Sequence, residues 1–214
     1  MKHIVLLLLT LFTSSYGVAE ELALDSQPVL PESPYSGYIS SPPSRVVLCT
    51  GDLGGINNAN CGPAKFQSQY IEGPRGFPTE GPPDGKIASA GNPVFSQLDA
   101  QSANRWYKSP MTAGYNTFTW TLKAPYNTYS WQFFITKQNW NPNAPLTRAS
   151  FELEPFCINY VPVDSTPLEN MSTDCVVPQR TGYQVILGVW TVSDKADAFY
   201  QVLDVNFGSY AMWP

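Results

Sequence analysis

Residues 117–123, Thr-Phe-Thr-Trp-Thr-Leu-Lys, alternate apolar and polar side chains. Because successive side chains of a β-strand point to opposite faces, this alternation predicts a strand with one buried face. Further segments are rich in aromatic or β-branched residues and are bounded by Pro, Asn or Gly. They are Tyr129–Thr136, Phe151–Phe156, Tyr183–Thr191 and Phe199–Phe207. Their spacing predicts an all-β fold, an immunoglobulin/fibronectin-like antiparallel β-sandwich.

The region from Leu48 to Arg105 is dominated by Gly, Pro, Asn and Gln and shows no sustained alternation. We interpret it as a long loop-rich insertion between the first strands, with a short helix around Ser96–Leu98. Long ordered loops on a sandwich often carry function. We expect one domain at residues 36–207, without internal repeats, and a C-terminal tail at residues 208–214.

The N-terminal residues have the three-part pattern of a secretory signal peptide. Met1-Lys2-His3 precede an apolar run from Ile4 to Phe12, and small residues follow up to Ala19. The run is shorter than the roughly 20 residues of a membrane span, and no second apolar stretch approaches that length, so we expect no transmembrane segment. The sequence therefore predicts a signal peptide at residues 1–19, an extended leader at residues 20–35, and a secreted, extracellular protein.

Four cysteines form two pairs that are close in sequence. Disulfides persist in an oxidising compartment, so we expect Cys49 to pair with Cys61 and Cys157 with Cys175. Three connectivities are possible in principle. A four-thiolate metal site is the other interpretation, but none of the spacings is the short C-x2-C type that such sites usually show.

The net charge of −5 gives no electrostatic surface for phosphate backbones or anionic lipid, so nucleic acid is not an expected partner. Low charge and many Tyr, Trp and Phe residues suit an extracellular domain that contacts neutral ligands such as sugars. The sequence contains one histidine, His3, within the predicted signal peptide. The mature chain would therefore lack the imidazole that catalytic triads and most zinc or copper sites require.

Several segments follow the motifs of one protein family, in the same order and with compatible gaps. They are Gly37–Ile39, Pro42–Arg45, Glu72–Gly73, Gly76–Pro78, Gly81–Ala90, Asn139–Trp140, Pro145–Phe151, Pro155–Cys157 and Ala198–Gln201. From Ser36 to Phe207 the chain thus resembles the chitin-binding type 4 domain of bacterial and viral lytic polysaccharide monooxygenases (auxiliary activity family ten). In that family an amino-terminal histidine and a second histidine hold one copper ion, which activates oxygen or peroxide for attack on crystalline chitin or cellulose.

The resemblance places Ser36 and Tyr126 at the two histidine positions. A neutral hydroxyl lacks the nitrogen donor that copper(II) prefers, and a phenol ionises only near pH ~10. The leader would also keep an amino terminus away from Ser36. Phe199 matches the axial aromatic residue of the family, and Glu72 matches a glutamate behind the copper ligands. We therefore expect a degenerate copper site, loss of the copper cofactor and no enzyme activity.

The sugar-binding face of the family is flat and carries one exposed aromatic residue. The resemblance assigns this role to Phe66, with Gln67 beside it, and places Glu72, Tyr126 and Asp194 on the same face. An aromatic ring can stack on the apolar face of a pyranose. Structural roles are also open, because Phe66 could fill a groove under its own loop and Asp194 could cap a turn.

Two more positions have structural alternatives. Phe199 could be core packing, and Glu72 could accept hydrogen bonds in a loop. Glu72 with Asp197 could also form the carboxylate pair of a glycosidase, although nothing in the sequence fixes their separation.

Together these patterns predict a secreted, monomeric, non-catalytic protein that binds chitin or another insoluble β-linked polysaccharide, such as cellulose. One alternative is an extracellular protein that uses the same sandwich to bind a partner or host protein. The other is a copper-dependent oxygenase with an unorthodox metal site.

Overall fold

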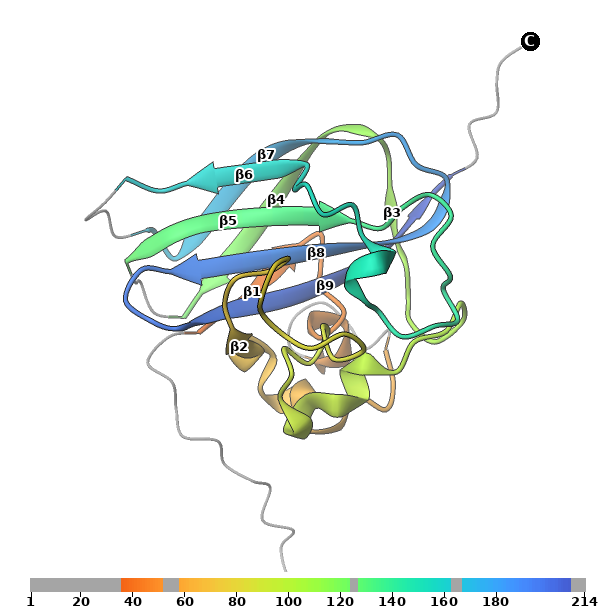
Figure 1. The fold of residues 1–214 in the computed structure, drawn as a ribbon, viewed down its shortest axis with the longest axis horizontal. Coiled ribbons are helices and arrows are strands. Elements are labelled where there is room, and N and C mark those ends of the chain that lie inside the picture. Colours follow the sequence, from red (N-terminus) through yellow and green to blue (C-terminus); the bar gives the residue numbers. More distant parts are fainter. Residues whose placement is uncertain (1–35, 52–57, 124–126, 163–166, 209–214) are drawn as a thin grey trace, which may run out of the picture. The chain divides into compact units, whose positions relative to one another are not determined.

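The computed structural model describes residues 36–51, 58–123, 127–162 and 167–208. Within these residues the strands form two sheets of a β-sandwich (Figure 1). The predicted signal peptide and leader, the predicted ligand position Tyr126 and most of the C-terminal tail lie outside the described residues.

The smaller sheet has three strands in the order β1-β4-β7. Their bounds are Gly37–Ser41 for β1, Gly114–Leu122 for β4 and Asn170–Val177 for β7. Both pairings in this sheet are antiparallel. The predicted strand at residues 117–123 corresponds to the C-terminal part of β4, the central strand.

The larger sheet has the order β2-β9-β8-β5-β6, and β3 also pairs with β9. Its strands are β2 (Glu72–Pro74), β3 (Ser109–Met111), β5 (Thr128–Ile135), β6 (Cys157–Tyr160), β8 (Gly182–Val192) and β9 (Asp197–Phe207). The pairing of β3 with β9 is parallel, and the others are antiparallel. The predicted all-β sandwich is confirmed, with this one parallel pairing as a difference in detail.

Aromatic side chains from both sheets fill the core. The three apolar side chains of residues 117–123 are fully buried and belong to the same cluster as inward-facing residues of the larger sheet. Trp190 of β8 stacks on Trp131 of β5, with ring centroids 6.4 Å apart, and on Phe199 of β9, at 4.7 Å. Across the two layers, Trp120 of β4 packs against Trp190, with ring centroids 6.0 Å apart, and burial of these large rings holds the two sheets together.

The predicted strands coincide with β4, β5, β8 and β9, with one exception. The strand predicted at Phe151–Phe156 is wrong: Phe151 makes only an isolated bridge to Thr136, directly after the short 3-10 helix η6 (Arg148–Ser150). Pro155 has no N–H to donate, so the segment cannot continue a regular ladder along β5.

The loop-rich insertion is confirmed. Its described residues include the short strand β2 and the 3-10 helices η1 (Val47–Cys49), η3 (Gly62–Phe66), η4 (Ser68–Tyr70) and η5 (Pro93–Asp99). Helix η5 includes the predicted helix at Ser96–Leu98, and its first turn is capped by Asn92, whose side chain accepts a hydrogen bond from the Val94 N–H. Figure 1 shows these turns gathered beside β1 and β9.

Both predicted disulfides are present, Cys49–Cys61 and Cys157–Cys175. The second joins β6 of the larger sheet to β7 of the smaller sheet, so it links the two layers covalently. Among the described residues, no helix has the length and apolar character needed to cross a membrane.

Candidate functional site

Ser36, the predicted first ligand position, lies where β1 begins beside the end of β4. Its carbonyl oxygen accepts a hydrogen bond from the Lys123 N–H at 2.9 Å, and only 4% of the residue is exposed. The next residue, Gly37, pairs with Leu122. A Cβ at Gly37 would lie 3.0 Å from the Leu122 and Trp190 side chains, a tighter contact than is usual, so glycine favours this close approach.

Glu72 and Phe199 are opposite each other in the pairing of β2 with β9. Phe199 is 1% exposed and stacks on Trp190, which agrees with the core-packing explanation for this residue. The Glu72 carboxylate accepts a hydrogen bond from the Lys195 ammonium at 2.9 Å. Glu72 therefore ties β2 to the turn between β8 and β9, which carries Asp194.

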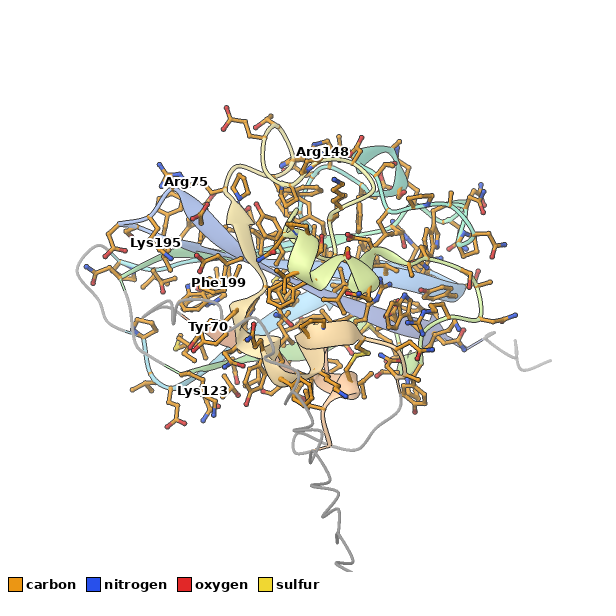
Figure 2. All side chains as sticks on the ribbon, turned by 90° about the horizontal axis from the view of Figure 1, so that it is seen from below. Tyr70, Arg75, Lys123, Arg148, Lys195 and Phe199 are labelled. Atoms are coloured by element: carbon orange, nitrogen blue, oxygen red, sulfur yellow. A yellow bond between two sulfur atoms is a disulfide. The ribbon has the colours of Figure 1, made fainter. Side chains whose placement is uncertain are left out.

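Arg75 holds the same turn from the other side. Its guanidinium donates to the Lys195 carbonyl at 2.9 Å, and its N–H donates to the Ala196 carbonyl at 3.1 Å. In the view of Figure 2, the labelled Arg75, Lys195, Phe199 and Lys123 follow one side of the domain. The exposed Asp194 is thus on a turn whose backbone is fixed by contacts from two other segments.

Phe66 ends η3 and is 64% exposed, as a residue that stacks on a sugar must be. The Lys65 ammonium lies 4.5 Å from the centroid of its ring. Beside it is a hollow of about 340 Å³, which we call the Phe66 hollow. Its lining residues are Tyr38, Thr50, Lys65, Phe66, Ser68, Gln69 and Lys123. This hollow brings Phe66 to the end of β4, next to Ser36.

Gln67 does not line the Phe66 hollow, and its side-chain oxygen is buried without a hydrogen-bond partner among the described residues. Asp197 lies opposite Pro74, offset by two residues from Glu72 along the paired strands. The ion pair of Glu72 with Lys195 agrees with a structural role for Glu72 as a hydrogen-bond acceptor, rather than with a role in a glycosidase carboxylate pair. Of the predicted binding residues that the structure describes, Phe66 and Asp194 are exposed.

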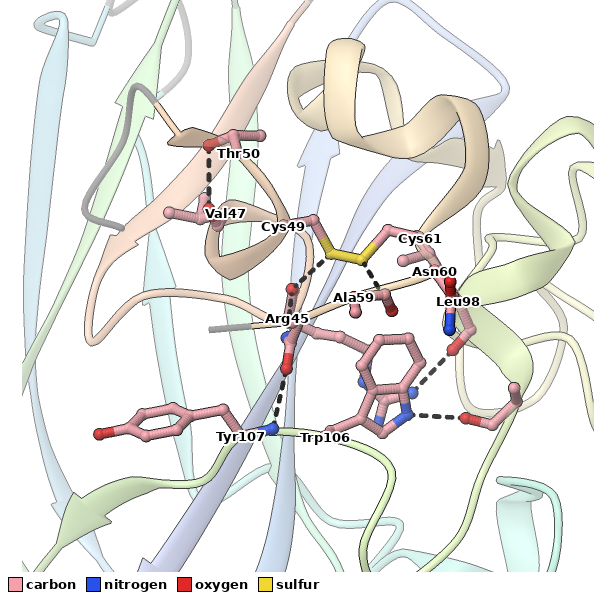
Figure 3. The surroundings of a disulfide bond; sticks show 12 residues. Arg45, Val47, Cys49, Thr50, Ala59, Asn60, Cys61, Leu98, Trp106 and Tyr107 are labelled. Atoms are coloured by element: carbon pink, nitrogen blue, oxygen red, sulfur yellow. Dashed lines mark hydrogen bonds between the residues drawn. A yellow bond between two sulfur atoms is a disulfide. The ribbon is translucent and has the colours of Figure 1, made fainter. Parts of the chain in front are cut away.

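The segment that carries Phe66 is anchored at its base by the Cys49–Cys61 disulfide and by Arg45 (Figure 3). Arg45 donates to the Leu98 carbonyl at 2.8 Å, and its guanidinium lies 4.5 Å from the centroid of the Trp106 ring. These contacts join the start of the insertion to its end, so η3 is attached to a rigid base.

The sequence alone did not single out Tyr38, Lys65 or Lys195 as parts of this surface. Lys65 and Lys195 are adjacent in sequence to predicted residues, and that adjacency is the one signal that could have found them. Tyr38 is 4% exposed, yet its ring lies 5.8 Å from the Lys123 ammonium and lines the Phe66 hollow. The position of Tyr38 beside Lys123 depends on the pairing of β1 with β4, two strands that are far apart in sequence.

The donor groups in the described residues do not fit a copper ion held by imidazole rings. The one histidine of the sequence, His3, lies outside the described residues, and Ser36 offers a hydroxyl. No cluster of three His, Cys, Asp or Glu side chains that could hold a metal occurs in the described part of the chain. A neutral hydroxyl is a poorer ligand for copper than the imidazole nitrogen that the ion prefers.

Proteins of similar sequence include two named GlcNAc-binding protein A. The one from Aliivibrio fischeri is 50% identical over 169 residues, which are 77% of this chain and 34% of the relative. The one from Vibrio cholerae is 47% identical over 181 residues, covering 80% of this chain and 36% of the relative. The chain therefore spans about a third of the length of these relatives.

Solved structures of similar fold include an AA10 lytic polysaccharide monooxygenase from Photorhabdus luminescens, 46% identical with a TM-score of 0.78. The catalytic domain of such a monooxygenase from Listeria monocytogenes is 45% identical with a TM-score of 0.73. Each comparison covers 80% of this chain and 98% of the other. The family described as "lytic polysaccharide mono-oxygenase, cellulose-degrading" matches residues 37–205. By sequence and by fold, this chain belongs to the lytic polysaccharide monooxygenase family, auxiliary activity family ten.

Proposed function

We propose that this protein is a secreted, monomeric, non-catalytic binding protein for chitin or another insoluble β-linked polysaccharide. The observation that carries this proposal is Phe66, an exposed ring on an anchored turn beside a hollow rimmed by polar groups. The names of the GlcNAc-binding relatives support chitin as the first polysaccharide to test.

Binding uses two kinds of contact. The ring of Phe66 stacks on the C–H face of a pyranose, which removes apolar surface from water. The ammonium groups of Lys65 and Lys123 and the hydroxyl of Thr50 can then form hydrogen bonds with sugar hydroxyls or acetamide oxygens at its edges. Asp194, on the restrained turn between β8 and β9, supplies an acceptor farther along the same side.

The absence of catalysis is part of the proposal. It is supported by the donor groups of the sequence, because the family resemblance assigns Ser36 and Tyr126 to the positions of the copper-binding histidines. Two oxygen side chains do not reproduce the affinity of two imidazole rings for copper. In this proposal Tyr126 contributes an aromatic ring to the sugar-binding face.

Retention on β-chitin and on microcrystalline cellulose tests the binding proposal. Phe66→Ala should lower retention about two- to tenfold, because the loss of an aromatic contact of about 0.5–1.5 kcal/mol lowers the affinity by a factor in that range. Tyr115→Ala is the matched control, since Tyr115 is 88% exposed but lies at the opposite end of β4 from Leu122. Absence of wild-type retention on both polymers, or equal retention of the two variants, would overturn the proposal.

Copper chemistry is tested separately. The purified protein is incubated with copper(II), dialysed, and then assayed by metal analysis and electron paramagnetic resonance. We expect no stoichiometric copper and no oxidised oligosaccharides from chitin in the presence of a reductant. Stoichiometric copper with oxidised products would show an oxygenase and reject the non-catalytic part of the proposal.

A further inference from the structure

A second hollow, of about 480 Å³, opens on the outer face of the larger sheet. Trp131 and Trp190 belong to the core cluster, so their neighbours along β5 and β8 point to the opposite, outer face. We call this cavity the β5–β8 hollow; its sheet residues include Ser130, Gln132, Val189 and Thr191. Its volume falls within the roughly 300–1,000 Å³ of small-molecule sites.

Ser130 contributes a buried hydroxyl that lacks a partner. The residue is 1% exposed, and its Oγ makes no hydrogen bond within the described residues. A buried hydroxyl without a hydrogen bond is unfavourable, and native proteins rarely retain one without a reason. A ligand hydroxyl in the β5–β8 hollow would supply the missing partner.

The remaining lining combines charged, polar and apolar groups. Arg75 and Glu80 bring opposite charges from the loop after β2, and Gln132 brings an amide that both donates and accepts. Phe77 and Tyr129 provide aromatic surface; Tyr129 is 55% exposed, and its ring makes an edge-to-face contact with Tyr160 at 5.8 Å. The Arg75 guanidinium is oriented by its hydrogen bond to the Lys195 carbonyl.

We propose that the β5–β8 hollow binds one neutral pyranose unit, as a free sugar or as the end of a soluble oligosaccharide. A pyranose has an apolar C–H face for the aromatic wall and hydroxyls that donate and accept hydrogen bonds. The Glu80 carboxylate would repel an anionic ligand, and the Arg75 guanidinium would repel a cationic one. The lining therefore favours a neutral ligand. A purely aliphatic ligand would leave the Ser130 hydroxyl and the Gln132 amide buried without partners.

This site is separate from the Phe66 hollow, although Ser193 in its lining is next in sequence to Asp194. The β5–β8 hollow and the Phe66 hollow share no lining residue. The inference therefore does not depend on chitin binding, and either proposal can fail while the other holds.

Titration of the full chain with glucose, N-acetylglucosamine and chitobiose, followed by amide NMR shifts, tests the inference. We expect saturable millimolar binding of at least one sugar, with shifts concentrated in residues 129–132 and 189–193. Gln132→Ala and Ser130→Ala should each weaken binding about five- to tenfold, the effect of one lost hydrogen bond. Because the Ser130 hydroxyl has no hydrogen-bond partner among the residues that the structure describes, Ser130→Ala should leave the thermal midpoint unchanged or raise it.

Tyr115→Ala is the control, because Tyr115 lines neither hollow, and it should leave these shifts and the sugar affinity unchanged. The inference is overturned if no sugar gives saturable shifts at the β5–β8 hollow, if the shifts move to the Phe66 hollow, or if the two hollow variants bind as wild type. Saturable binding of inorganic sulfate or of an alkylammonium ion, without sugar binding, would identify an ion site instead. Chitin retention of Gln132→Ala, measured in parallel, keeps the two proposals apart.

Discussion

Arg45 and Asp204 form a bidentate ion pair inside the domain, with nitrogen–oxygen distances of 2.8 and 2.7 Å. The side chains are only 2% and 0% exposed. Arg45 also donates to Gln101, while Asp204 accepts a hydrogen bond from the Tyr183 hydroxyl at 2.6 Å. The pair attaches the loop-rich insertion to β9, so the position of the Phe66 segment depends on two charges with no access to water.

Asp204→Ala should destabilise the protein by about 3–5 kcal/mol, because it leaves the Arg45 charge buried and uncompensated. Urea unfolding followed by tryptophan fluorescence measures this change. Asp84→Ala is the comparison, since Asp84 is 50% exposed in its ion pair with Arg148 and should cost only about 0–1 kcal/mol. Similar losses in the two variants would show that the buried pair is not an anchor.

Stability should fall at alkaline pH because of Tyr200. Burial raises the pKa of Tyr200 above its ordinary value of 10.0. A pKa that is raised in the folded state favours the protonated phenol, so its stabilising contribution is complete below pH 10 and declines as the pH rises toward the folded pKa. Tyr200→Phe should flatten the decline of unfolding free energy above that pH. An unchanged slope would contradict this assignment.

The two disulfides should differ in their effect on chitin retention. Replacing either pair by alanine should cost about 3 kcal/mol, because the closed loops are of similar size. Loss of Cys49–Cys61 should also weaken retention, since this bond anchors the segment of Phe66, whereas loss of Cys157–Cys175 should not. Retention assays well below the melting temperature of each variant separate the two effects. Equal retention would remove the anchoring argument.

Gly188 permits close packing between the sheets. A Cβ at this position would overlap the Ile39 side chain of β1 and contact the ring of Phe133 at 3.4 Å. Gly188→Ala should therefore destabilise the domain by about 1–3 kcal/mol through overpacking. Gly208→Ala, with no atom within 4 Å of its added Cβ, should change thermal stability little. A neutral result at Gly188 would mean that β1 adjusts its distance from β8.

The long strands were predictable because each buries large side chains at a period that the sequence displays. Strand β7 was missed, although Thr173, Cys175 and Val177 alternate as buried residues along it. Its small and polar side chains resemble those of loops in composition. The short strands β2 and β3 have no pattern of their own, because three residues are defined only by pairing with β9.

The candidate sites depend on contacts between distant residues. Phe66 could be proposed because the resemblance points to a single aromatic position. The contact of Glu72 with Lys195 spans 123 residues, and no local pattern predicts it. Ser130 occupies an ordinary outward position of a strand. Its missing hydrogen bond becomes visible only after the loop after β2 has closed over β5 and β8.

The bond between Cys157 and Cys175 has a consequence for association between molecules. Strands β6 and β7 are the outer strands of their sheets, and an outer strand exposes backbone groups that can template pairing with another chain. The disulfide ties these two outer strands to each other, so neither can detach and exchange with a neighbour. Selective reduction of this bond should therefore first produce strand-exchanged dimers, visible by size-exclusion chromatography, while the circular dichroism of the sheets is still intact.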